Sequence, residues 1–177
     1  MAKRLSIDGY GQLELNHVAF RRDGRIEAQC KLAEGIEYVE NGMLLAVDQT
    51  TRTVSKPTGS DEFIALNYTT EHMYDERLAN GLKHFKLDKN TFLPRLGYLV
   101  TGDKFTTNCV SVEDAAAEGD KALPAEVDAV IAKGATYGHT CDNGSILINN
   151  TKAGAVVKVV KADTMPDGQY AVKFIAL

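Results

Sequence analysis

Short apolar runs separated by turn residues recur along the chain, and this pattern predicts strands. Asn-Gly and Asp-Gly pairs mark tight turns, because both central positions of a type I′ hairpin turn need positive φ. Such pairs stand at Asp8-Gly9, Asp23-Gly24, Asn41-Gly42, Asn80-Gly81, Asn143-Gly144 and Asp167-Gly168. The runs between them predict strands at Met43–Val47, Thr50–Lys56, Glu62–Leu66, Tyr98–Thr101, Phe105–Val112, Ser145–Ile148, Ala155–Val160 and Tyr170–Ile175. Short strands at this spacing are typical of a mainly β fold, a small antiparallel β-barrel or sandwich.

The stretch Leu96–Asn108 illustrates the pattern, since it joins an apolar run to a Thr-rich run through one turn. Gly102-Asp103 is expected to turn the chain, so that Thr106 and Thr107 point to alternate faces of the following strand. This stretch is therefore predicted to close a sheet.

Two regions depart from the strand pattern and read as insertions in a β-barrel domain that spans residues 41–177. The region 112–133 is rich in Ala and acidic residues, and Pro-Ala-Glu at 124–126 is typical of a first helical turn. A loop followed by a short helix over Ala125–Lys133 is therefore predicted. The region 71–89 fits a helix broken at Asn80-Gly81 or a strand hairpin, and the pattern does not choose between them.

The first forty residues differ from the rest in character, and their first twenty-five carry an excess of basic side chains. Over residues 1–25 the basic side chains outnumber the acidic side chains Asp8, Glu14 and Asp23. The basic residues there are Lys3, Arg4, Arg21, Arg22 and Arg25. An N-terminal arm or edge hairpin over 1–40 that reaches onto a neighbour and an ordinary first strand pair both fit this segment.

Composition narrows the class of protein. The chain has 177 residues, 44% of them hydrophobic and 25% charged, which is average for one folded soluble domain. Its net charge of -4 argues against direct nucleic-acid binding as its main task. No apolar run is long enough to span a membrane, and the first residues do not resemble a secretion signal. Three widely spaced cysteines indicate free thiols in a reducing compartment.

The residue patterns that accompany catalysis are not found. No serine lies in a Gly-x-Ser-x-Gly context, no phosphate-binding loop is present, and Cys109 is expected to be a small buried hydrophobe. His139, Cys141 and Asp142 are clustered but lack a second ligand pair, so a polar hairpin tip explains them better than zinc. We expect no catalytic residue, no cofactor and no metal, and hence no enzyme.

Several segments resemble the head decoration (cement) or head-fibre-base proteins of tailed bacteriophages. They are Gly42–Val54, Leu93–Asn108, Tyr137-Gly138 with Asn143–Ile148, and Ala162–Phe174, so the likeness spans residues 40–177 and leaves out the first forty. The resemblance implies a β-barrel on the outer capsid surface, fixed at junctions of the major capsid protein. It also implies a homo-oligomer, often a trimer, without catalytic residues, made in the host cytoplasm and carried on the virion.

The resemblance assigns a role to the basic N-terminal segment and leaves alternatives open. Lys3, Arg4, Arg21, Arg22 and Arg25 become candidates for contact with an acidic capsid surface. The regions 71–89 and 112–133 exceed a minimal cement barrel, which leaves a simple clamp and a fibre platform both open. The alternatives are a tail-tube-like or adaptor virion component, and a small cytosolic enzyme with a site built from His84, Asp103 and His139.

Overall fold

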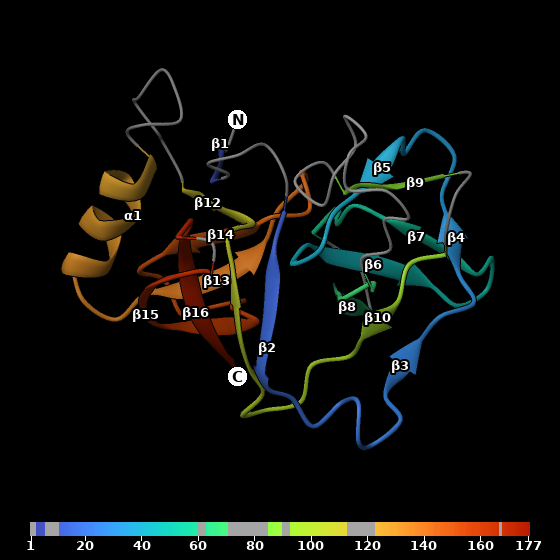
Figure 1. Ribbon diagram of the computed structural model, residues 1–177, viewed down its shortest axis with the longest axis horizontal. Coiled ribbons are helices and arrows are strands. Elements are labelled where there is room, and N and C mark those ends of the chain that lie inside the picture. The colour runs from blue at the N-terminus through green and yellow to red at the C-terminus, as the bar shows by residue number, and fades with distance from the viewer. Residues whose placement is uncertain are drawn as a thin grey trace.

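The computed structural model describes residues 3–5, 11–59, 63–70, 85–89, 93–112, 123–166 and 168–177 (Figure 1). Within these ranges the chain is mainly β, with three sheets and one short helix. This confirms the fold class predicted from the strand pattern. No helix in the described ranges is both long and apolar enough to cross a membrane.

The largest sheet has eight strands. In spatial order they are β1 (Lys3–Leu5), β12 (Val110–Val112), β14 (Ile146–Asn149), β13 (Tyr137–Thr140), β15 (Val157–Thr164), β16 (Tyr170–Ala176), β11 (Lys104–Thr107) and β2 (Leu13–His17). Neighbouring strands are antiparallel except β12 and β14, which run parallel. The described parts of the first twenty residues therefore pair within the chain, and a role of residues 1–40 as an arm stays a prediction.

The large sheet cannot be flat, because only a short segment of chain connects its two edge strands. β1 ends at Leu5 and β2 begins at Leu13, eight positions later, which an extended chain covers with at most about 28 Å. A flat sheet with seven strand-to-strand gaps is about 34 Å wide. The edges must therefore approach each other, as in a barrel that stops short of closure.

A second sheet has six strands and is curled more tightly. In spatial order they are β3 (Ile26–Glu27), β10 (Leu96–Gly97), β8 (Ile64–Asn67), β6 (Leu44–Asp48), β7 (Thr53–Ser55) and β4 (Lys31–Leu32). Only residues 28–30 join its two edges, β3 and β4, so the edges lie within about 14 Å, whereas a flat sheet of six strands is about 24 Å wide. β5 (Tyr38–Val39) and β9 (Leu87–Asp88) form a separate pair beside it.

The small sheet is covered on both faces, and this explains its continuous apolar strands. On β6, Leu44 packs into the core of the large sheet, while Leu45 packs into the core of the small sheet. Leu66 and Ala65 on β8 divide in the same way. Because successive side chains on a strand point to opposite faces, a strand between two cores needs apolar residues at every position.

Polar backbone groups meet where the two sheets join. The amide of Leu44 donates to the carbonyl of Gly144 at 2.8 Å, which links β6 to the turn before β14. The thiol of Cys109 donates to the carbonyl of Asn41 at 3.1 Å. Groups buried in this way are costly to leave unpaired, so these contacts fix how the two sheets meet.

One helix, α1 (Leu123–Ala132), covers part of the large sheet (Figure 1). Pro124 lies in its first turn, where the missing amide costs no hydrogen bond. Val127 is buried in the core, and Tyr170 of β16 donates its hydroxyl to Asp128 Oδ1 at 2.6 Å. The helix predicted over 125–133 is therefore confirmed, beginning two residues earlier.

One strand prediction is wrong and another is wrong in part. Tyr98–Thr101 is not a strand, because the amide of Val100 donates to Asp103 Oδ2 at 3.0 Å and the chain turns there. Phe105–Val112 is two strands, broken at residues 108–109, where the amide of Cys109 turns to Thr107 Oγ1 at 3.0 Å. The alternatives weighed for residues 71–84 lie outside the described residues.

Candidate functional site

Two large apolar side chains are exposed around one hollow on the small sheet. Ile26 and Phe63 are 45% and 47% exposed, and both line a cavity of about 470 Å³. Tyr98, Arg25 and Gln49 complete most of its wall. We call Ile26, Phe63, Tyr98, Arg25 and Gln49 the Phe63 patch. Exposed apolar side chains beside a hollow are typical of protein-binding surfaces rather than of bare solvent-facing sheet.

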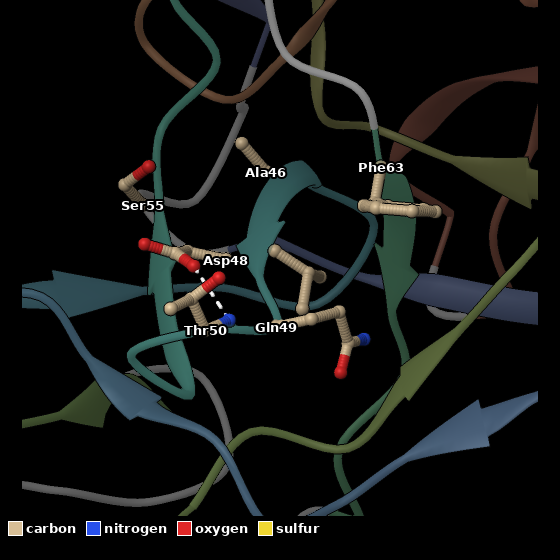
Figure 2. A pocket seen from close by; sticks show the side chains of 7 residues that line it. Ala46, Asp48, Gln49, Thr50, Ser55 and Phe63 are labelled. Carbon is tan, nitrogen blue, oxygen red and sulfur yellow. Dashed lines mark hydrogen bonds between the residues drawn. The ribbon is translucent and has the colours of Figure 1, made fainter.

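A second hollow of about 250 Å³ adjoins the first and shares Phe63 and Gln49 with it. Figure 2 shows Ser55, Asp48 and Thr50 on one side of this hollow and Phe63 opposite them. Asp48 Oδ1 accepts the amide of Thr50 at 2.8 Å. Hydrogen bonds from Thr51 and then from the Thr50 amide hold the pKa of Asp48 below its usual range. The carboxylate of Asp48 therefore stabilises the turn that contains Thr50 and Thr51.

Several hydrogen bonds hold the Phe63 patch in place. The carbonyl of Phe63 accepts the amide of Val47 at 2.9 Å, which ties it to β6. The amide of Tyr98 donates to the carbonyl of Arg25 at 3.0 Å, and Gln49 Nε2 donates to the Tyr98 hydroxyl at 2.6 Å. Burial raises the pKa of Tyr98, so its ring and hydroxyl stay neutral at physiological pH. A partner would therefore meet a preorganised surface, which lowers the cost of ordering it.

The loop between β2 and β3, which carries Arg21, Arg22 and Arg25, is anchored by one aromatic ring. Phe20 is fully buried and contacts the ring of Tyr68 at a centroid distance of 5.2 Å. It also covers Gly97, where a Cβ atom would come within 2.3 Å of the Phe20 ring, so this position needs glycine for close approach. Asp103 Oδ1 accepts the amide of Ala19 at 2.5 Å. The ring of Phe20 and the backbone amide of Ala19 therefore fix the start of this loop.

The structure divides the five predicted contact residues between two places. Lys3 and Arg4 belong to β1, at one edge of the large sheet, where they pair with Val112 and Ser111. Arg21, Arg22 and Arg25 lie in the loop between β2 and β3, at the opposite end of the molecule (Figure 1).

Within the loop, only part of the basic charge is neutralised. Arg22 forms an ion pair with Asp23 at 2.7 Å. That pair raises the pKa of Arg22 and lowers the pKa of Asp23. Arg21 and Arg25 have no ion-pair partner among the described residues. Of the five predicted residues, Arg25 alone lines the Phe63 patch.

Of the three residues named for an enzymatic alternative, the two that the structure describes, Asp103 and His139, are not brought together. Asp103 is buried and its carboxylate accepts the amides of Ala19 and Val100. His139 lies on β13, and Asp103 directly precedes β11, with β15 and β16 between those strands. His139 Nε2 lies 3.0 Å from Asn149 Oδ1. His84 lies outside the described residues.

The surroundings of the three cysteines, and of the cluster of His139, Cys141 and Asp142, suit structural roles. Cys30, Cys109 and Cys141 are buried, and none of them forms a disulfide bond. Burial raises the pKa of both Cys30 and Cys141, so neither is poised as a thiolate. Among the described residues, no three His, Cys, Asp or Glu side chains lie together as metal ligands.

The sequence pattern missed the Phe63 patch for a definite reason. Phe63 and Ile64 are consecutive apolar residues, so alternation does not show which one is exposed. Ile26 belongs to a strand of two residues and meets Gly97 across the sheet, a pairing between positions far apart in the chain. The one sequence feature that could have indicated the patch is Phe63 itself, an aromatic residue beside a turn.

Comparisons of this chain with models of known families, with curated proteins and with solved structures find no match. What the Phe63 patch can bind is therefore inferred from its geometry. Its apolar rim and hollow can accept an apolar side chain, and Arg25 can pair with a carboxylate beside it.

Proposed function

We propose that this chain is a structural virion protein that binds the outer surface of a tailed-phage capsid and stabilises or decorates it. The observation that carries the proposal is the Phe63 patch, in which two half-exposed apolar side chains and an arginine surround a hollow on a rigid sheet. Such a surface suits adhesion to another protein. The resemblance of residues 40–177 to head decoration proteins supports the capsid as the partner.

In this proposal the partner is the major capsid protein, and the chain acts as a homo-oligomer on the shell. An apolar side chain of the shell enters the hollow, and Arg25 pairs with an acidic group next to it. Arg21 lies in the same exposed loop as Arg25 and adds to its positive charge. The candidates Lys3 and Arg4 then lie at a separate place, on the edge strand β1.

Binding to purified heads tests the proposal. Heads lacking the chain are mixed with wild-type protein, with Phe63→Ser, and with Leu93→Ser as a control that removes an exposed apolar side chain outside the patch, since Leu93 is 51% exposed. Each mixture is centrifuged, and bound protein is measured against concentration. Losing an interface aromatic costs about 1–3 kcal/mol, so Phe63→Ser should bind about 5- to 150-fold more weakly and Leu93→Ser like wild type.

The two outcomes that oppose the proposal are distinct. Wild-type protein that remains in the supernatant at every concentration would refute capsid binding. Negative-stain images that show stacked rings in place of surface knobs would assign the chain to a tail-tube-like or adaptor role.

The contribution of the basic loop requires its own variants. Deleting residues 2–25 would remove β1 and β2 from the large sheet and confuse binding with folding. Charge reversal at the exposed Arg21 and Arg25 leaves the strands intact. Weaker binding of Arg21→Glu/Arg25→Glu at low salt would support contact with an acidic capsid surface, and unchanged binding would exclude it.

A further inference from the structure

A second surface of different chemistry lies on the large sheet. On β16, Ile175 pairs with Lys104 of β11 on one side and with Lys158 of β15 on the other. Directly paired residues project to the same face of a sheet, so these three side chains form a row across three strands. Two positions earlier on β16, Lys173 pairs with Lys161 of β15. We call Lys104, Lys158, Lys161 and Lys173 the lysine face.

The lysine face is the solvent side of the sheet. The alternate positions on the same strands point the other way, since Phe105, Phe174 and Val159 are buried in the core. The rings of Phe105 and Phe174 contact each other with centroids 5.6 Å apart. The side chains of Lys104, Lys158 and Lys161 are exposed, and Lys173 is half-buried.

Most of this positive charge is not neutralised within the described chain. Lys161 forms an ion pair with Asp163 at 3.1 Å. Lys104, Lys158 and Lys173 have no such partner among the described residues. The hydrogen bond from Lys161, with a further contribution from the charge of Lys173, holds the pKa of Asp163 below its usual range.

The arrangement of the lysines destabilises the unbound chain and favours binding to acidic groups. Like charges directly opposite each other on paired strands are destabilising, and Lys161 and Lys173 are such a pair. An acidic partner would remove this repulsion and gain the Coulomb attraction of the remaining lysines. The charge distribution therefore suits a surface that is covered by acidic groups in the working state.

The residues between the lysines favour a protein over a nucleic acid. Ile175 stands between two lysines, and Val160, at the bulge of β15, is 50% exposed. A protein surface with an apolar residue among acidic ones would bury these side chains, whereas a phosphate backbone would not. The net charge of -4 for the whole chain also weakens attraction to a polyanion.

We propose that the lysine face is a second docking site, which binds an acidic surface of a shell subunit next to the one held by the Phe63 patch. This inference rests on the proposed function. The lysine face belongs to the large sheet and the Phe63 patch to the small sheet, which occupy different halves of the molecule (Figure 1). One chain would thus bridge two neighbours, with each contact raising the effective concentration of the other.

Head binding of matched lysine variants at two salt concentrations tests this site. The test variant is Lys104→Gln/Lys158→Gln/Lys173→Gln, and the control is Lys31→Gln/Lys89→Gln/Lys133→Gln, which removes three exposed lysines elsewhere. Both variants change the net charge equally. At 50 mM NaCl the test variant should bind about tenfold more weakly than the control. At 500 mM NaCl, where surface charges are screened, the two should bind alike.

The outcomes separate the two proposals. If wild-type protein does not bind heads at all, the proposed function fails and the bridge fails with it. If wild-type protein binds and Phe63→Ser binds weakly, but the two lysine variants bind equally at 50 mM NaCl, the second docking site alone is refuted. Lysine-dependent binding of a DNA duplex that is as tight as head binding would also overturn it. Circular dichroism of each variant confirms that the fold is retained.

Discussion

Gly42 offers a sharp test of how the two sheets meet. It stands two residues before β6 with φ of +85°, and its amide donates to the carbonyl of Asn67 at 2.9 Å. A Cβ atom there would lie 1.9 Å from Thr107 Oγ1 on β11. That oxygen cannot simply move away, because it donates to the carbonyl of Gln12 at 2.7 Å and accepts the amide of Cys109 at 3.0 Å.

The expected cost of Gly42→Ala has several parts. The left-handed backbone costs a non-glycine residue about 1–2 kcal/mol. The steric overlap in a packed region costs about 1–3 kcal/mol, and disturbing the Thr107 hydrogen bonds about 1 kcal/mol more. Alanine restricts the unfolded chain, which returns about 0.4–1 kcal/mol. We therefore expect a loss of about 4 kcal/mol in the free energy of unfolding.

Gly154→Ala is the matched control. Gly154 has φ of +76° and nothing within 4 Å of the added Cβ, so this variant carries the backbone cost without the overlap. Its expected loss is about 1 kcal/mol. Urea unfolding followed by circular dichroism gives both values. Equal losses for the two variants would refute the close approach of Gly42 to Thr107 of β11, and with it the described junction of the sheets.

Two further predictions concern single side chains. Asp103→Ala should cost about 2–4 kcal/mol in the free energy of unfolding, because the amides of Ala19 and Val100 lose their acceptor; hydrogen exchange should accelerate at those two amides, and unchanged exchange would contradict the role of Asp103. Burial and then the carboxylate of Asp128 raise the pKa of Tyr170 above its ordinary value near 10. Its neutral form is thus favoured by the fold, so this stabilisation is complete below pH 10 and is lost as the pH rises further. Tyr170→Phe should flatten the fall in stability above pH 10, measured by urea unfolding at several pH values, and an unchanged profile would rule out this cause.

Elements whose signal is local could be predicted from the sequence. Leu44 and its neighbours form one apolar run, which fits the strand between two cores. The Asn143-Gly144 pair does mark the turn of the hairpin between β13 and β14, but five residues, 141–145, link the strands and only Gly144 of the pair has positive φ, so the turn is not of the two-residue type I′ kind. The helix that includes Pro124 follows from its first turn.

Elements set by distant side chains could not be predicted. Asn108 ends β11 and accepts the amide of Gln12 at 2.7 Å, and its Nδ2 donates to Gln169 Oε1 at 3.0 Å. These partners are 96 and 61 positions away, so no window of sequence contains them. The strand pattern therefore merged β11 with β12, although β12 lies near the other edge of the large sheet.

The candidate sites share this limit. The charge count drew attention to the basic residues of the first 25 positions, and Arg25 does line the Phe63 patch. The lysine face draws its members from β11, β15 and β16, and only the register of those strands places Lys104, Lys158 and Lys173 together. Charge counted along the chain does not reveal charge gathered across a sheet.

Adhesion to a protein shell is the central claim, and the composition of native particles tests it most directly. Particles released from the host culture that carries the coding sequence are purified on a density gradient, and their proteins are quantified by mass spectrometry. We expect this chain in the particle fraction at a fixed ratio to the major shell protein, and its release when the shell is dissociated. Intact particles without the chain, together with its full recovery from the soluble cell extract, would contradict the account.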